Sequence, residues 1–218
     1  MDGNRRWAKD RNKPSLEGHR AGYERLKEIA EICTDRGIKV LTVFAFSTEN
    51  WKRSEEEVGY LMDLLEFALS KELHKFHEKG IRLKVIGRRK NLRPSILRAI
   101  ENAESETKNN DRGTLCICIN YGGRPEIVDA CRKIVERRMK PEEINEAAIQ
   151  SAMYWPDMPD PDLVIRTSGE ERLSGFLTWE AVYSEIYWCQ KHWPDFDEAE
   201  LDKALEEYAA RQRRFGGG

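Results

Sequence analysis

The sequence predicts an α/β protein in which one domain contains a central, mostly parallel sheet flanked by helices. Short β-branched and aromatic runs alternate along the chain with longer segments whose apolar residues have helical spacing. No hairpin signal separates the runs, so successive strands are expected to pair in parallel through helical connections. The 218 residues are enough for one sizeable core, which favours a single domain over residues 1–218.

The first predicted elements are a helix and the strand that follows it. Residues 18–36 carry apolar side chains at helical spacing, and Gly37 follows them as a typical C-terminal glycine. Residues 39–47, with the sequence KVLTVFAFS, form the β-branched and aromatic run that is typical of a buried parallel strand.

The alternation of helices and strands then continues to residue 166. We expect helices over residues 55–79, 94–109 and 125–138, and strands over residues 82–87, 114–120 and 163–166. The helix over 55–79 has two apolar stripes, which is more apolar surface than one contact with a sheet requires. Two interpretations remain: a helix packed between the sheet and a neighbour, or one wall of an apolar tunnel.

Charge and cysteine content exclude several classes of function. The 37 Lys and Arg residues nearly balance the 39 Asp and Glu residues, so no overall positive field attracts nucleic acid or an anionic membrane. None of the five cysteines forms a CxxC pair, which favours buried thiols in a reducing cytoplasm over a zinc site or disulfides.

No GxGxxG or P-loop motif supports nucleotide binding. No apolar run reaches the roughly 20 residues of a membrane span, so we expect a cytoplasmic protein.

The N-terminal segment MDGNRRWAK concentrates side chains that suit a metal and a phosphate. Asp2 can hold a hard cation through oxygen, and Gly3 lets backbone amides approach an anion closely. Arg5 and Arg6 can each bind phosphate oxygens bidentately. The segment therefore indicates a Mg²⁺ and diphosphate site, with an ordinary turn in a basic terminus as the alternative.

A second anion site is predicted after the strand over residues 163–166. Arg166 ends that strand, and Arg172 and Ser174 follow within nine residues. They supply two guanidiniums and a hydroxyl for a second diphosphate. Residues 47–50 follow the strand over 39–47, and both segments therefore lie at carboxyl ends of strands, where open α/β sheets bind ligands.

Six ordered motifs carry a resemblance to a known family. They are MDGNRRWAK at residues 1–9, Gly18-His19, FSTENW at 46–51 with Arg53, NYGGR at 120–124, DLVIRTSGE at 162–170 and WPDF at 193–196. In this order they resemble the cis-prenyltransferases, the family of undecaprenyl diphosphate synthase, over nearly the whole chain. The resemblance implies Mg²⁺-dependent condensation of isopentenyl diphosphate with an allylic diphosphate, such as farnesyl or geranyl diphosphate, to a Z-polyprenyl diphosphate. It also implies the apolar tunnel, in which the family holds its growing product between helices and sheet.

The resemblance assigns roles to residues of these motifs. It implies that Asp2 binds Mg²⁺ and assists departure of the allylic diphosphate, and that Asn50, with Ser47, takes part in proton removal from isopentenyl diphosphate. A neutral amide is a weak base, so Asn50 is expected to act through water or diphosphate. Arg6 is implied to serve the allylic substrate, and Arg166 and Arg172 isopentenyl diphosphate. Implied substrate contacts comprise Gly3, Asn4, Arg5, Arg6, Trp7, His19, Ser47, Thr48, Glu49, Trp51, Arg53, Arg166, Arg172, Leu173 and Ser174.

A homodimer is a further implication of the resemblance. Glu185 lies in the apolar segment 176–189, where a carboxylate is unfavourable unless it is paired or metal-bound. In the family an acidic metal ligand from the neighbouring subunit maps to this position, and a salt bridge to an arginine is the alternative. Arg214 and Gly216 match the family's C-terminal Arg-x-Gly, which reaches the diphosphate of the partner subunit.

Several positions depart from the family pattern or lie outside it. Family members usually carry a short apolar strand before the MDGN motif, and that strand is missing before the first residue here. Ser15 stands where many long-chain bacterial members have an arginine, and Glu171 where some relatives have a metal-binding histidine. His74, His77 and His192 match no motif, and we expect them to be surface or core residues.

A non-catalytic partner subunit of a prenyltransferase complex is the alternative function. Such subunits typically lack the aspartate of the first motif, whereas Asp2 is present here. We therefore expect a catalytic, cytoplasmic protein that hands its product to the membrane.

Overall fold

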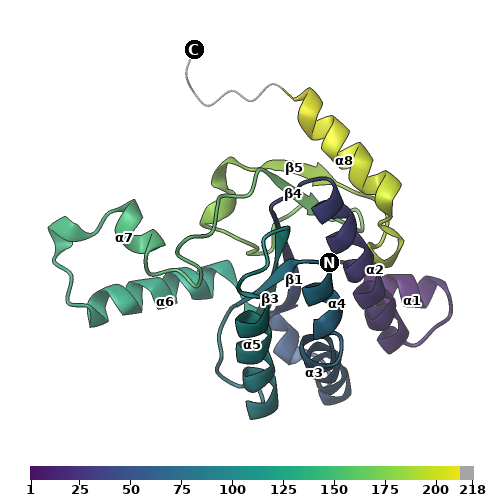
Figure 1. The fold of residues 1–218 in the computed structure, drawn as a ribbon, viewed down its shortest axis with the longest axis horizontal. Helices are drawn as coiled ribbons and strands as arrows, with labels where there is room; N and C mark the ends of the chain where they lie inside the picture. Colours follow the sequence, from purple (N-terminus) through teal and green to yellow (C-terminus); the bar gives the residue numbers. More distant parts are fainter. Residues whose placement is uncertain (212–218) are drawn as a thin grey trace. The chain divides into compact units, whose positions relative to one another are not determined.

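All strand pairs among residues 1–211, the part of the chain that the structure describes, are parallel, as predicted. The computed structural model contains two units, each with its own sheet (Figure 1). The central unit comprises Ala30–Pro159 and Ser174–Glu180. The terminal unit comprises Met1–Ile29, Asp160–Leu173 and the described chain from Ala181 onward.

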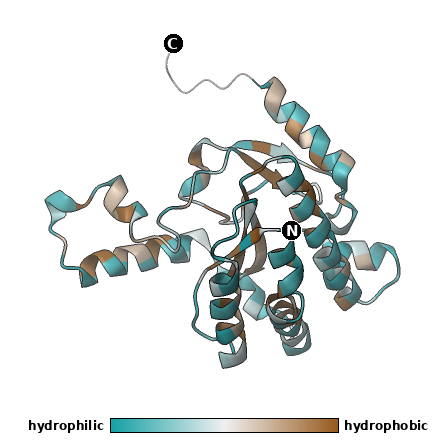
Figure 2. Cartoon of the chain, in the orientation of Figure 1, coloured by the Kyte–Doolittle hydropathy of each residue, from teal (hydrophilic) through white to brown (hydrophobic). Residues whose placement is uncertain are grey.

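The central unit is built on a three-stranded sheet in the order β1-β3-β2. Strand β1 covers Val40–Ser47, β2 covers Ile81–Ile86 and β3 covers Gly113–Tyr121. The middle strand β3 is buried along almost its whole length, which explains its nearly continuous apolar sequence GTLCICINY. In Figure 2 the strands of this sheet have the colours of hydrophobic residues, whereas the surrounding helices show alternating colours.

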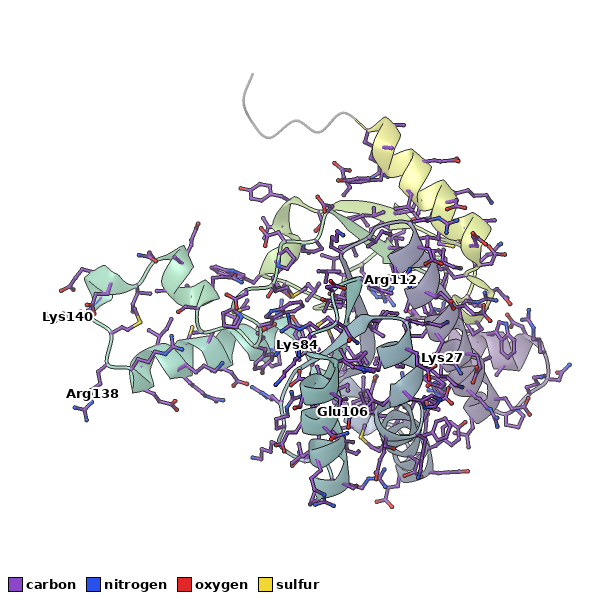
Figure 3. The ribbon with its side chains drawn as sticks, viewed as in Figure 1. Lys27, Lys84, Glu106, Arg112, Arg138 and Lys140 are labelled. Carbon is purple, nitrogen blue, oxygen red and sulfur yellow. The ribbon has the colours of Figure 1, made fainter. Side chains whose placement is uncertain are left out.

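Five helices and two short 3-10 turns accompany this sheet. They are η1 (Thr48–Lys52), α3 (Glu55–Ser70), α4 (Leu73–Glu78), α5 (Pro94–Thr107), α6 (Gly123–Glu136), η2 (Pro141–Glu143) and α7 (Glu146–Gln150). Helices α4 and α5 pack against β2, and α3 packs against α5. Beyond α6 the labelled side chains of Arg138 and Lys140 point outward (Figure 3).

The single helix predicted over residues 55–79 is wrong, because the chain forms two helices there. The hydroxyl of Ser70 donates to the Glu66 carbonyl at 2.6 Å, and α3 ends at this residue. Such bonds compete with the helical ladder. The apolar stripe nevertheless continues across the break, since Leu69 and Leu73 are both buried.

The terminal unit contains a two-stranded sheet of β4 (Leu163–Arg166) and β5 (Glu185–Trp188). Its other elements are α1 (Asn4–Asp10), the first part of α2 (Ser15–Asp35), η4 (Trp193–Asp195) and α8 (Glu198–Ala210). Helix α1 contacts η4, and α8 contacts β5. The 3-10 turn η3 (Glu180–Tyr183) precedes β5.

The predicted strands and the other predicted helices are confirmed within a few residues as β1 to β4, α2, α5 and α6. Cysteines 33, 116, 118 and 189 are buried free thiols, as expected, but Cys131 is exposed on α6, so its assignment to the core was wrong. Among the described residues, no helix combines the length and apolar composition that a membrane span requires.

Candidate active site

Asp2 is held by its backbone against the loop that follows β4. Its amide donates to Thr167 Oγ1 at 3.2 Å, and its carbonyl oxygen accepts from three donors. They are the hydroxyls of Thr167 at 2.8 Å and Ser168 at 3.0 Å, and the backbone amide of Trp193 at 3.0 Å. The backbone is thus fixed, while 39% of the Asp2 side chain is exposed and accessible to a ligand.

Two guanidiniums face the Asp2 carboxylate. Arg166 Nη2 lies 3.1 Å from Oδ2, and Arg6 Nη2 lies 3.4 Å from Oδ1. Partial burial raises the pKa of Asp2, but the hydrogen bond from Arg166 and the two positive charges outweigh it, so the pKa is lowered overall. Asp2 is therefore an anion at neutral pH and able to hold a cation.

Glu170 links the arginine of the first motif to the second predicted anion site. Its Oε1 accepts from Arg6 at 2.7 Å, and its Oε2 pairs with Arg172. The hydrogen bond from Arg172 is the main cause that lowers the pKa of Glu170. Arg6, Arg166 and Arg172 thus gather around two carboxylates, which leaves one positive charge in excess for an anionic ligand.

The glycine of the first motif is required by packing as well as by backbone conformation. Gly3 has a φ of 102°, and a Cβ there would lie 1.8 Å from Ser168 Oγ. The side chain of the next residue, Asn4, packs against Gly22 of α2. Its buried Oδ1 has no hydrogen-bond partner among the described residues. Arg5 is exposed at the start of α1.

The WPDF motif packs on the first motif. Trp7 Nε1 donates to Asp195 Oδ1 at 2.8 Å, and Arg11 pairs with the same carboxylate at 3.1 Å while lying 4.5 Å from the Trp7 ring centre. Lys13, close to the departure at Ser15, pairs with Glu17, and its Nζ also lies 5.7 Å from the Trp7 ring centre.

Two histidines of the terminal unit, His19 and His192, lie in different surroundings. His19 is buried, with 6% exposure, in α2. His192 matches no motif and was expected to be a surface or core residue; it is half-buried and has two hydrogen-bond partners. Its Nδ1 lies 2.7 Å from Ser168 Oγ and its Nε2 lies 3.1 Å from Asp10 Oδ2. No motif signal identified it; only the fold brings it beside the Asp2 loop.

The other predicted site residues lie in the central unit, where β1 and β3 end together with Ser47 opposite Tyr121. Asn50 Oδ1 accepts from the Ser47 amide at 3.0 Å. This bond fixes the orientation of the Asn50 amide at the end of β1. Thr48 and Glu49 lie in the same 3-10 turn.

Trp51 and Arg53 are anchored to their own unit. Trp51 Nε1 donates to Asn120 Oδ1 at 2.8 Å, and Arg53 pairs with Glu57 at 2.9 Å. Asn120, from the NYGGR motif, has a φ of 49° and its amide nitrogen donates to the carbonyls of Arg88 and Lys90. Asn120, near the end of β3, thus links Trp51 in the turn after β1 to the loop that follows β2.

The remaining predicted residues are placed as follows. Leu173 is half-buried and ends its segment of the terminal unit, whereas Ser174 is exposed with a φ of 50° and belongs to the central unit. Glu171 is exposed.

Glu185 pairs with Arg211 at 2.8 Å, so the salt bridge considered as an alternative is present. Arg214 and Gly216 lie outside the described residues.

The arrangement around Asp2 suits one magnesium ion shared with a diphosphate. Mg²⁺ commonly takes one or two carboxylates and completes its shell with waters and substrate phosphates. Asp2 offers such a carboxylate beside guanidiniums that match phosphate oxygens. Within residues 1–211 no group of three or more His, Cys, Asp or Glu side chains forms a metal cluster, so a site made of protein ligands alone is absent there.

Fold and candidate site together define an α/β protein in which arginines gather beside a carboxylate whose backbone is fixed. The family model described as "Putative undecaprenyl diphosphate synthase" matches residues 1–216. The isoprenyl transferases of Heliobacterium mobile and Thermotoga maritima are 48% and 46% identical over 100% of this chain, and over 85% and 94% of their own lengths.

Solved structures agree with the sequence relatives. Lavandulyl diphosphate synthase from Lavandula x intermedia, solved in complex with dimethylallyl diphosphate, matches with a TM-score of 0.94 and 35% identity, covering 100% of this chain and 95% of that one. A probable undecaprenyl diphosphate synthase from Campylobacter jejuni matches with a TM-score of 0.81 and 32% identity over 90% and 92%. The chain belongs to the undecaprenyl diphosphate synthase family and is a prenyltransferase. The resemblance carried by the six motifs is thereby confirmed.

Proposed function

We propose that the chain, acting as one cis-prenyltransferase domain, condenses isopentenyl diphosphate with an allylic diphosphate to a Z-polyprenyl diphosphate in a Mg²⁺-dependent reaction. The observation that carries this proposal is the Asp2 carboxylate, fixed through its backbone and flanked by Arg6 and Arg166. The dimethylallyl diphosphate in the lavender relative supports an allylic diphosphate at this site. Asp2 also favours a catalytic chain over a non-catalytic partner subunit.

The residues of the terminal unit would stabilise the departing diphosphate. Bound Mg²⁺ would supply positive charge to the diphosphate oxygens. Arg6, with Gly3 and Arg5 beside it, would hold the allylic diphosphate. Arg166 and Arg172 would exchange their carboxylate partners for the oxygens of isopentenyl diphosphate. Because the donors are already gathered, little reorganisation accompanies the growth of charge.

The residues of the central unit would act on the second substrate. The new bond joins the allylic carbon to isopentenyl diphosphate, which then loses a proton as the double bond forms. Asn50 and Ser47 would orient the water or diphosphate oxygen that takes this proton, since the Asn50 oxygen already accepts from the Ser47 amide. Trp51 and Arg53 would shape the same site from η1 and its end.

The product and the assembly extend the proposal. Helix α3 carries the half-buried Leu61 and Leu64 and the exposed Phe67, which supports its role as a wall of the product tunnel. Val182 and Tyr183 are exposed apolar side chains within the segment 176–189 that contains Glu185, which supports a homodimer contact there. In that dimer Glu185 would serve the partner's metal, and Arg214 and Gly216 the partner's diphosphate. The protein would act in the cytoplasm and release product to the membrane.

The direct test is incubation with farnesyl diphosphate, labelled isopentenyl diphosphate and Mg²⁺, followed by chromatography of the products. We expect labelled Z-polyprenyl diphosphate, and none when the metal is removed with EDTA. Geranyl and dimethylallyl diphosphate in parallel reactions identify the preferred primer. No product with any primer, in a folded sample, would contradict the proposal and favour the partner-subunit alternative.

A further inference from the structure

Three side chains to which the motifs assign no role form a hydrogen-bonded chain that ends at Asp2. Asp10 Oδ2 lies 3.1 Å from His192 Nε2, and His192 Nδ1 lies 2.7 Å from Ser168 Oγ. Ser168 Oγ lies 3.0 Å from the Asp2 carbonyl oxygen. The chain joins the end of α1, the residue before η4 and the loop after β4, which are distant in the sequence but belong to one unit.

The direction of these hydrogen bonds follows from what each group can donate. The Asp2 carbonyl can only accept, so the hydroxyl proton of Ser168 points toward it. The Ser168 oxygen then accepts from His192 Nδ1. The ionised Asp10 carboxylate can likewise only accept, which places a proton on His192 Nε2. Both ring nitrogens of His192 therefore donate, and the bonds run outward from the imidazole, one to Asp10 and the other through Ser168 to the Asp2 carbonyl.

Ser168 occupies this position in spite of an unfavourable backbone conformation. Its φ of 75° is one that glycine adopts without strain, and the backbone is held there by the bond from its amide to the Lys191 carbonyl at 2.8 Å. What serine has and glycine lacks is the hydroxyl that reaches Asp2. The unfavourable backbone conformation of Ser168 therefore accompanies the hydrogen bond from its hydroxyl to the Asp2 carbonyl.

A Ser-His-Asp set is also the composition of a hydrolase triad, but the geometry here does not suit a nucleophile. Ser168 is only 8% exposed. A Cβ on Gly3 would lie 1.8 Å from its Oγ and 2.7 Å from His192 Nδ1, so Gly3 packs directly over both groups. A substrate carbon has no room to approach the hydroxyl, whose proton already faces Asp2.

We propose that Asp10, His192 and Ser168 are positioning residues that set the orientation of the Asp2 peptide and thereby of its carboxylate. The proposal rests on the prenyltransferase function proposed above. Thr167 and Trp193 fix the Asp2 carbonyl from two directions, and Ser168 supplies the third. Small displacements of a metal-binding carboxylate lower the rate more than they weaken binding of the second substrate.

Two substitutions at His192 separate positioning from packing. In His192→Asn the amide nitrogen can replace Nδ1 and keep the bond to Ser168, whereas in His192→Gln it replaces Nε2 and keeps only the bond to Asp10. We expect His192→Gln to lower kcat by about five- to tenfold, the range of one lost hydrogen bond, with an unchanged KM for isopentenyl diphosphate. His192→Asn should retain most of the wild-type kcat.

A binding measurement provides a readout that does not depend on turnover. Calorimetry gives the Kd of farnesyl diphosphate with Mg²⁺ and with EDTA, in the absence of the second substrate. The gain in affinity due to Mg²⁺ should be smaller in His192→Gln than in the wild type and restored in His192→Asn. The affinity measured in EDTA should be the same in all three proteins.

Two further variants keep the test valid if the histidine variants are unstable. Ser168→Gly removes the hydroxyl but relaxes the backbone, so it should fold and show the lowered kcat. Asp10→Ala should lower kcat by about two- to threefold, because a partly exposed charge contributes less. Glu28→Ala is the matched control: its side chain is 58% exposed against 59% for Asp10, it pairs with Arg25, and it should leave kcat unchanged.

The possible outcomes distinguish the two proposals. Wild-type kcat in His192→Gln and Ser168→Gly, beside an active wild type, would overturn the positioning role alone. Equal losses in His192→Asn and His192→Gln that follow the melting temperature would also overturn it, because they would indicate packing. A folded wild-type protein that makes no product would overturn the proposed function and this inference with it.

Discussion

The terminal and central units hold their candidate catalytic residues in different ways. In the terminal unit, Asp2 is positioned by residues more than 160 positions away, through Thr167, Ser168 and Trp193. In the central unit, Asn50 bonds to Ser47, three residues earlier, at the end of the strand that carries them. The position of the Asp2 carboxylate therefore depends on tertiary contacts, whereas that of the Asn50 amide depends on a local turn.

The Asp2 and Glu170 carboxyls of the terminal unit also differ from the Glu126 carboxyl of the central unit in the charge state that the fold favours. Arginine contacts lower the pKa of Asp2 and Glu170 in the terminal unit. In the central unit, burial raises the pKa of Glu126, which is 1% exposed, although bonds from Tyr121 and Tyr154 act in the opposite direction. The fold thus favours charged carboxylates at Asp2 and Glu170 in the candidate site, whereas the Glu126 carboxyl lies in the core.

The largest expected effect is that of removing the carboxylate of the terminal unit. Asp2→Ala should lower kcat by at least about a hundredfold, as is typical when a metal-holding group is lost. The backbone bonds of residue 2 do not involve its side chain, so the variant should still fold, with a melting temperature lowered only by the loss of the ion pairs to Arg6 and Arg166. Steady-state kinetics with farnesyl and isopentenyl diphosphates measure the first effect and calorimetry the second. Near-normal turnover would contradict the role of Asp2.

A smaller loss is expected from the local site of the central unit. Asn50→Ala should lower kcat by about tenfold or more, because the group that orients the proton acceptor is removed and the Ser47 amide loses its partner. Asn50→Asp keeps an acceptor for that amide and serves as the control for the turn. If Asn50→Ala retained full kcat with both substrates saturating, Asn50 would have no part in proton removal.

A third prediction concerns how the arginines divide between the substrates. Arg172→Ala should raise the KM for isopentenyl diphosphate by about tenfold, equivalent to about 1.4 kcal/mol, and change the KM for the allylic substrate less. Its bond to Glu170, which also binds Arg6, explains why some effect on the allylic substrate remains. Arg132→Ala, a similarly exposed arginine paired with Asp129, is the control. Equal increases in both KM values would indicate one shared anion site.

Sequence patterns predicted the central unit better than the terminal unit. The buried runs that became β1, β2 and β3 are long enough for their composition to identify them, and only the break after Ser70 escaped notice because no Gly or Pro marks it. In the terminal unit, β5 has four residues and α1 has seven, which is too short for a periodic signal.

The candidate site shows the same contrast. The motifs identified Asp2, Arg6 and Arg166, because these residue types in this order suit a metal and phosphates. They could not identify His192, whose partners Asp10 and Ser168 come from other segments and are brought to it only by tertiary structure. A motif indicates which groups meet a ligand but not which groups hold them in place.

The smallest predicted effect is on stability, and it tests the difference in charge state between Glu126 of the central unit and Asp2 of the terminal unit. Because the pKa of Glu126 is raised in the folded protein, the unfolded chain loses this proton first as the pH rises above the ordinary value near 4.5. The Glu126 carboxyl therefore destabilises the fold at pH 8 relative to pH 4. Glu126→Gln keeps an oxygen for the Tyr154 amide, which donates to Glu126 Oε1 at 2.9 Å, and removes the charge.

We expect Glu126→Gln to raise the melting temperature by a few degrees at pH 8 and to have no such effect at pH 4. Asp2→Asn should show the opposite pattern, because a carboxyl with a lowered pKa contributes stability above its unfolded pKa and loses that contribution as the pH falls. Its cost at pH 8 should diminish as the pH falls below the ordinary value near 3.8. Melting curves of both variants and the wild type over this pH range measure the two differences. Parallel pH profiles for the two variants would contradict the contrast between a charged ligand site and a buried core carboxyl.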